Sequence, residues 1–128
     1  YFKSHSFHWN VEGPNFQQYH SFFNDLYEEL HDAVDPIAEH IRTLDAYAPV
    51  GLSDLYDAKT VMDESGLISD TKQMFASLLL ANDTVIESLN KAFQLATYNN
   101  KQGLCNFLAD RLDIHAKHAW QIKSHLKG

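Results

Sequence analysis

Cysteine, long apolar runs and basic residues are all scarce in this chain of 128 residues. Cys105 is the only cysteine, which excludes a disulfide within the chain and fits a reducing compartment, so we expect a cytoplasmic protein. No run of about 18 apolar residues occurs, and no membrane span is therefore expected. Lys and Arg number 10 against 17 Asp and Glu, which gives a formal net charge of −7. This balance suits the capture of cations and opposes a generally nucleic-acid-binding surface.

Glycine and proline are also few, at five and three residues, and neither repeats nor linkers occur. The chain has no G-x-S-x-G turn and no glycine loop for phosphate, which leaves hydrolase and nucleotide-binding patterns without support. We therefore predict one domain over residues 1–128. The first residue is Tyr1 and not Met, so we expect a further segment before it, and the lack of a signal peptide is uninformative.

The spacing of apolar residues predicts an all-α chain. Between Phe16 and Leu44 they recur in steps of three and four, the pattern of an amphipathic helix, with Asn15 as its expected N-cap. Two more long helices are predicted over about 69–97 and 101–126.

The connection before the third long helix spans residues 45–68. A bare loop of that length is unusual, and 53–61 is expected to form a short helix capped by Ser53. Residues 1–12 are expected to be the end of a truncated first helix, because a bundle needs helices of matched length.

Two histidines, His8 and His20, lie symmetrically about the turn signal at residues 13–15, Gly-Pro-Asn. If helices flank that turn they form an antiparallel hairpin, and the two imidazoles sit at the same height. Further along, Asp35 and Glu39 share a helix face because they are four residues apart. Two imidazoles and two carboxylates suit a borderline cation such as iron or zinc.

One chain cannot bring all four side chains to one ion. His20 and Asp35 are separated by fifteen residues, or about 22 Å along a helix axis. They share a side of that helix, so a two-fold axis near residues 27 and 28 would place His20 of one chain opposite Asp35 and Glu39 of its copy. The spacing therefore predicts two identical sites per dimer, each built from both chains.

These residues carry a family resemblance. The stretch HWNVEGPNF, the step between the histidines, D-x-x-x-E within AVDPIAEHIRTL, and DRLDIHAKHAW near the C-terminus resemble the Dps mini-ferritins, the DNA-protection-during-starvation proteins. The resemblance covers nearly the whole chain. It implies a ferritin-like four-helix bundle, with a long crossover carrying a short helix between the second and third helices, in a homo-oligomeric shell of about twelve subunits.

The resemblance also implies a ferroxidase centre at the two-fold interface, with a pair of irons per site. His8 and His20 would come from one subunit, and Asp35 and Glu39 from its neighbour. One position departs from the family, which usually has an aspartate four residues after the second histidine, where this chain has Asn24. A neutral amide is a weaker ligand for iron, or acts only on the ligands around it, so the His20 position should fill at higher Fe(II) than the His8 position.

Several other polar and aromatic residues are candidates for roles in the site or the core. Trp9, beside His8, is a candidate sink for oxidising equivalents or an ordinary interface aromatic. Asp110 and Asp113 are candidates for a three-fold ion channel in the resembled architecture, or an exposed acidic helix face. His115 is predicted to be a hydrogen-bonded core histidine, and the E-x-x-H pair at residues 28–31 is assigned to a surface or interface because such di-iron motifs occur twice.

The leading prediction is a ferroxidase that oxidises Fe(II), with hydrogen peroxide favoured over oxygen, and stores Fe(III) within the shell, protecting against oxidative damage. The alternative is a DNA-compacting stress protein in which the metal site is secondary. DNA binding would need a basic tail before Tyr1, since the chain itself is acidic. A third possibility is a structural zinc site that joins the dimer.

Overall fold

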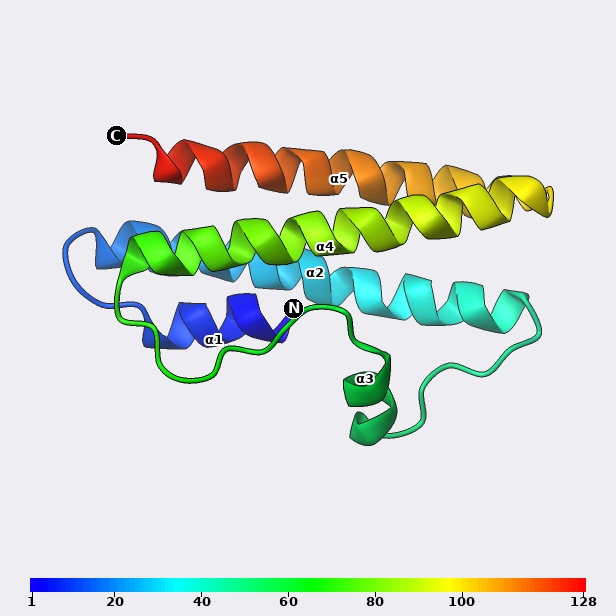
Figure 1. The fold of residues 1–128 in the computed structure, drawn as a ribbon, viewed down its shortest axis with the longest axis horizontal. Helices are drawn as coiled ribbons and strands as arrows, with labels where there is room; N and C mark the ends of the chain where they lie inside the picture. Colours follow the sequence, from blue (N-terminus) through cyan, green and yellow to red (C-terminus); the bar gives the residue numbers. More distant parts are fainter. The chain divides into compact units, whose positions relative to one another are not determined.

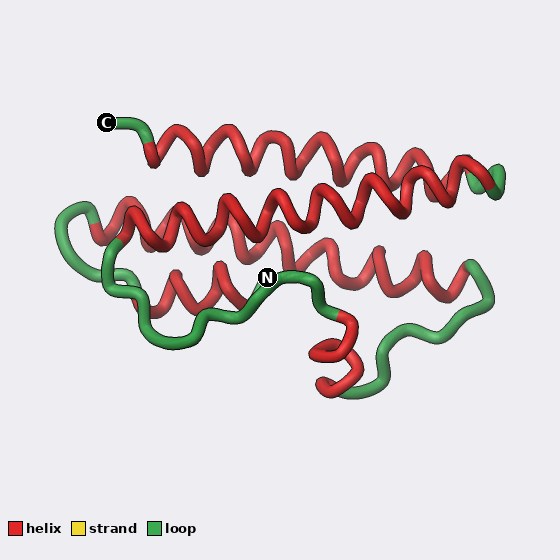
Figure 2. The backbone as a smooth tube through the Cα atoms, viewed as in Figure 1, coloured by secondary structure: helices red, strands yellow, loops and turns green.

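The computed structural model describes residues 1–128 and contains helices but no strand (Figures 1 and 2). The helices are α1 (Phe2–Asn10), α2 (Phe16–Thr43), α3 (Leu52–Ala58), α4 (Thr71–Tyr98) and α5 (Gln102–Leu126). They fall into two compact units, Tyr1–Ser69 and Asp70–Gly128, so the single domain expected from the sequence stays a prediction. None of the helices is both long enough and apolar enough to cross a bilayer.

The first unit contains the predicted hairpin, in which α1 packs along α2 (Figure 1). The chain reverses through Gly13, at φ 98°, and Asn15, at φ 66°, both in the left-handed region that Gly and Asn tolerate best. Asn15 occupies the N-cap position of α2, as predicted, but its side chain makes no capping hydrogen bond. Buried Phe7 and Phe23, with ring centroids 6.0 Å apart, join the two helices.

The predicted short helix in the connection is present as α3, but its predicted boundaries and cap are wrong. The N-cap is Gly51 and not Ser53. The reason is Asp54, whose Oδ2 accepts hydrogen bonds from the backbone N–H groups of Val50, at 2.9 Å, and Gly51, at 3.2 Å. The same two donors lower the pKa of the Asp54 carboxyl, because they stabilise its charged form.

The connection is also tied back to α1 by an ion pair. Nζ of Lys3 lies 2.5 Å from Oε1 of Glu64, and both side chains are largely shielded from solvent. This contact links Glu64, in the connection, to Lys3 of α1. Because the pair is shielded, salt screens it less than it would screen an exposed pair.

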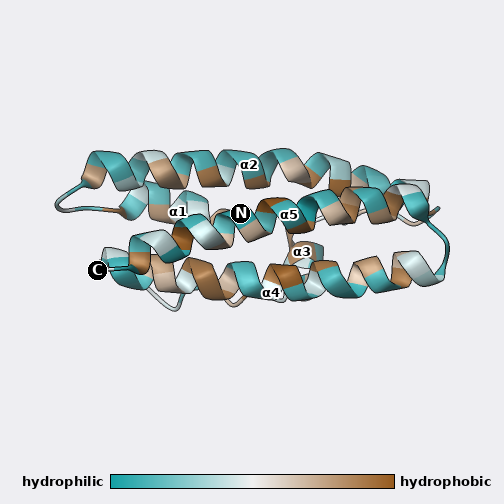
Figure 3. Cartoon of the chain, turned by 90° about the horizontal axis from the view of Figure 1, so that it is seen from above, coloured by the Kyte–Doolittle hydropathy of each residue, from teal (hydrophilic) through white to brown (hydrophobic).

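The second unit is the antiparallel pair of α4 and α5. Helix α4 begins after Asp70, whose side chain accepts a hydrogen bond from the backbone N–H of Lys72. Apolar and polar stretches alternate along both helices, as expected of amphipathic elements (Figure 3). Their buried apolar side chains are Met74, Phe75, Leu78, Ala96, Leu108, Ala119 and Ile122.

A polar network lies among these apolar side chains. The guanidinium of Arg111, 6% exposed, donates from Nη2 to Nε2 of His115, 3% exposed, over 3.0 Å. Since a guanidinium only donates, Nε2 must accept, and Nδ1–H of His115 then donates to Oδ1 of Asn82 over 2.8 Å. Asn82 returns a hydrogen bond from Nδ2 to the His115 carbonyl over 3.0 Å. The predicted hydrogen-bonded core histidine is thus confirmed, with both ring nitrogens occupied.

Replacing Asn82 by Ala should destabilise the protein, because it removes two buried hydrogen bonds between α4 and α5. We expect the free energy of unfolding to fall by about 2 kcal/mol. Urea unfolding followed by circular dichroism measures this. Asn90→Ala, at an exposed position on the same helix, is the matched control and should change stability by less than about 0.5 kcal/mol. Equal losses in the two variants would contradict a stabilising role for the network.

Candidate metal centre

The hairpin brings His8 of α1 and His20 of α2 face to face. Their ring centroids lie 3.7 Å apart, with an angle of 18° between the planes. Both side chains are half-buried. The juxtaposition expected from the spacing of the two histidines about the turn is therefore confirmed, and it arises because each residue lies at the same distance from the reversal of the chain.

The two histidines also hold each other in place through the backbone. Nδ1 of His8 lies 2.8 Å from the His20 carbonyl, and Nδ1 of His20 lies 2.7 Å from the His8 carbonyl. A carbonyl oxygen only accepts, so each Nδ1 must carry the hydrogen. In a neutral imidazole this leaves the lone pair on Nε2, which is the form that binds a metal. The pair therefore presents two oriented nitrogen atoms as candidate metal ligands.

One of these hydrogen bonds also completes the end of a helix. His8 lies in the last turn of α1, where carbonyl groups have no partner within the helix. The His20 imidazole supplies a donor for one of them. The ring of Phe16 stacks on His20 at 4.9 Å and 24°, and so restricts its rotation further. The local fold and the orientation of the ligands therefore depend on the same contacts.

The two carboxylates lie elsewhere on α2. Asp35 and Glu39 are exposed and take part in no hydrogen bond or ion pair within the chain. Because α2 is one continuous helix, about 22 Å separates Asp35 from His20 along its axis. No group of three or more His, Cys, Asp or Glu side chains converges within one chain. The structure thus brings together two of the four predicted ligands, and the roles of all four stay predictions.

Two apolar side chains close to Asp35 in the sequence are also exposed. Val34 is 52% exposed and Ile37 41% exposed, on either side of Asp35 along the chain. At about 100° per residue, Val34 lies about 100° and Ile37 about 160° around the helix from Asp35, so neither shares the face of the carboxylates. On a single copy of the chain this part of α2 is left open.

The remaining predicted residues occupy varied environments. Asn24 is half-buried on α2, one turn after His20, and makes no hydrogen bond within the chain. Trp9 is 57% exposed at the end of α1. Asp110 and Asp113 are exposed on α5, a position that fits both an ion channel and a plain acidic face.

Three residues beside the site, His5, Tyr27 and Tyr1, were not predicted as site residues from the sequence. His5 stacks on Tyr27 with ring centroids 3.8 Å apart and planes 4° from parallel, and Tyr1 lies within hydrogen-bonding distance of His5. Tyr27 in turn contacts His8, with centroids 5.2 Å apart. Helical spacing was the available signal, since His5 lies three residues before His8 and therefore on the same face of α1.

Comparisons with known proteins relate the whole chain to one family. The family model described as a ferritin-like domain, Ferritin, matches residues 1–128. A curated relative, the DNA protection during starvation protein of Helicobacter pylori (strain J99), is 29% identical over 98% of this chain and 88% of its own length.

Solved structures show the same likeness. Dps from Staphylococcus aureus is 28% identical, with a TM-score of 0.92 over 99% of this chain and 85% of that one. The Dps protein of Vibrio cholerae O1, described as a member of a broad superfamily of ferritin-like diiron-carboxylate proteins, has a TM-score of 0.92 at 22% identity, over 98% and 79% of the two chains. The predicted fold class, a ferritin-like four-helix bundle with a crossover that carries a short helix, is confirmed.

The reciprocal contacts predict the protonation pattern of the two histidines. Solid-state NMR of metal-free protein with ¹⁵N-labelled histidine should show that the neutral imidazoles of His8 and His20 carry their hydrogen on Nδ1 and are bare at Nε2. His125, whose Nδ1 lies 2.8 Å from the Gln121 carbonyl, is an internal reference for the same tautomer. Finding the hydrogen on Nε2 of either His8 or His20 would contradict the assignment.

Proposed function

We propose a function from one premise: the chain belongs to the ferritin-like family, and within it to the Dps mini-ferritins. It acts as a ferroxidase and iron-storage protein, with Fe(II) as substrate and a closed homo-oligomer of about twelve copies as the store. The observation that carries the proposal is the His8–His20 pair, whose two Nε2 atoms are left with their lone pairs while both Nδ1 atoms are engaged.

The site is completed by a second copy of the chain. An antiparallel contact between two α2 helices about a two-fold axis sets the imidazoles of one copy against Asp35 and Glu39 of the other. The carboxylates offset the charge of the bound iron, and the imidazoles match its borderline character. Asp35 and Glu39 are exposed on a single copy, so a second copy can reach both carboxylates.

The chemistry needs two electrons for each peroxide. Two Fe(II) ions at one site each supply one electron, so hydrogen peroxide is reduced to water without release of hydroxyl radical. A few protein ligands leave coordination positions open for the oxidant. We favour peroxide over oxygen because one pair of irons matches its electron demand.

Delivery and storage follow from the charge of the chain. A net charge of −7 attracts cations to each copy. Asp110 and Asp113 are proposed to line the entry route, and the Fe(III) product accumulates inside the shell.

Residues 1–128 act as one ferritin-like domain in the cytoplasm under this proposal. Trp9 is a candidate sink for stray oxidising equivalents.

Compaction of DNA is the rival function. The Helicobacter pylori relative is named for DNA protection, yet the excess of acidic residues in this chain disfavours contacts with phosphate. We propose that residues 1–128 by themselves bind duplex DNA weakly. A structural zinc site is the other rival, and it differs in one direct respect: zinc gives no absorbance change with peroxide, whereas oxidation of Fe(II) does.

The shared site predicts complementation between two inactive variants. His20→Ala and Asp35→Ala should each slow peroxide-dependent Fe(II) oxidation at least about tenfold. Co-assembled in equal amounts, they should regain about one quarter of the parental activity, since a quarter of the sites then combine an intact histidine half with an intact carboxylate half. Absorbance of Fe(III) measures the rate, and native mass spectrometry measures assembly and subunit mixing.

The matched control for that experiment is a mixture of His20→Ala with His8→Ala. Both substitutions damage the histidine half of the site, so every site in the mixture lacks one imidazole and activity should not return. If neither mixture regains activity although the subunits have exchanged, the shared site is wrong.

Asn24 predicts unequal iron positions within each site. Anaerobic titration with Fe(II), followed by calorimetry, should show two classes of affinity, with the weaker class at the His20 position. Asn24→Asp supplies a charged oxygen there and should tighten the weaker class about tenfold. Asn106→Asp, an equal change in charge at an exposed position on α5, should alter neither class. Equal affinities in the parent that Asn24→Asp leaves unchanged would count against this assignment.

A further inference from the structure

Aromatic rings form a continuous path beside the candidate metal centre. We name Tyr1, His5, Trp9 and Tyr27 the aromatic cluster. Its central contact is the parallel stack of His5 on Tyr27, with centroids 3.8 Å apart. The Trp9 ring lies 4.2 Å from the His5 ring, and the Tyr27 ring lies 5.2 Å from the ring of His8. Rings at such separations are in van der Waals contact, so electrons can pass between them over short steps.

Tyr1 is joined to this path by a hydrogen bond. Its hydroxyl lies 2.9 Å from Nδ1 of His5, within one turn of the chain. A phenol is the stronger acid and an imidazole nitrogen the stronger base, so the phenol donates and Nδ1 accepts. Loss of an electron from a phenol makes its O–H strongly acidic. A base already in contact can take that proton, and this makes the oxidation easier than at a phenol without a partner.

The other two oxidisable rings of the cluster lack such a partner. Neither the Tyr27 hydroxyl nor the Trp9 indole N–H makes a hydrogen bond within the chain. Trp9 is also 57% exposed, against 45% for Tyr1. An electron hole that enters the cluster would therefore cross Tyr27 and His5 and come to rest at Tyr1, where the proton can move with it.

We propose that Tyr1 is an electron donor to the iron site, acting through His5 and Tyr27 when peroxide meets a site that holds a single Fe(II). The inference rests on the proposed ferroxidase function. Fe(II) gives one electron and becomes Fe(III), and Tyr1 gives the second and becomes a neutral phenoxyl radical. The O–O bond of hydrogen peroxide breaks, and two protons from solvent complete two water molecules. The phenol proton of Tyr1 moves to Nδ1 of His5.

The consequence is protection at low iron. A single Fe(II) supplies only one of the two electrons that peroxide needs, and the product of that one-electron reduction is hydroxyl radical. A second electron from Tyr1 removes this product at its source. The oxidising equivalent then resides on one defined side chain at the edge of the site.

Freeze-quench electron paramagnetic resonance on the assembled protein tests the proposal. Peroxide is added to protein holding Fe(II) well below saturation of the sites. The parent should give a tyrosyl signal, identified by its change when ring-deuterated tyrosine is incorporated, and D₂O should alter the coupling of the hydrogen-bonded proton. Tyr1→Phe should lower the signal at least about tenfold, and so should His5→Phe, which keeps a ring but removes the proton acceptor.

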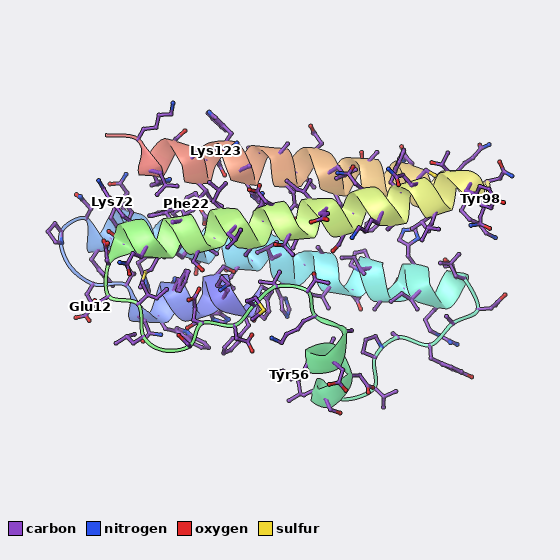
Figure 4. All side chains as sticks on the ribbon, in the orientation of Figure 1. Glu12, Phe22, Tyr56, Lys72, Tyr98 and Lys123 are labelled. Atoms are coloured by element: carbon purple, nitrogen blue, oxygen red, sulfur yellow. The ribbon has the colours of Figure 1, made fainter.

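Two controls separate this role from a structural one. Tyr27→Phe keeps the ring path and removes only a hydroxyl without a hydrogen-bond partner, so the tyrosyl signal should persist. Tyr56→Phe, at a 64% exposed position on α3 (Figure 4), should also leave it unchanged. A full signal in Tyr1→Phe, a radical on Trp9 in place of Tyr1, or no radical while iron is oxidised would overturn the proposal. Failure of the parent to oxidise iron at saturating Fe(II) is a distinct result, because it rejects the proposed function and this inference with it.

Discussion

The paired hydrogen bonds between His8 and His20 are the interaction on which the first unit depends. Each imidazole donates to the carbonyl of the other residue, so the pair joins α1 to α2 and completes the end of α1. The same bonds select the tautomer that leaves Nε2 able to bind a cation. Folding of the hairpin therefore also orients the two candidate ligands, and the stacked ring of Phe16 restricts His20 further.

Histidines in the two units show how environment decides chemistry. His115 is buried with both ring nitrogens engaged, by Arg111 and by Asn82, and so has no lone pair to offer a metal. His8 and His20 are half-buried and engage one nitrogen each. A side chain of the same type is thus structural in the α4–α5 pair and a candidate ligand in the α1–α2 hairpin.

The length of α2 explains why the proposed site belongs to two copies. A continuous helix is a rigid spacer, and about 22 Å separates its histidine end from its carboxylates. No rearrangement within one hairpin can close that distance. Sharing the site between copies also couples assembly to activity, because an isolated copy would hold only half of the ligands. Iron chemistry would then occur only where a shell exists to receive the product.

The sequence by itself determined the long helices, the hairpin and the pairing of His8 with His20. Apolar residues in steps of three and four and a Gly-Pro-Asn turn are local patterns, which can be recognised from a short stretch of sequence without the rest of the chain. It also identified His115 as a core histidine from its place on an apolar stripe. The predicted cap of α3 was wrong because Asp54 accepts hydrogen bonds from the backbone N–H groups of Val50 and Gly51, so the helix begins after Gly51 and not at Ser53. Tertiary structure alone revealed the tautomers, the Asn82–His115–Arg111 network and the stack of His5 on Tyr27. Those features depend on distances between atoms of different helices, which spacing along one helix does not specify.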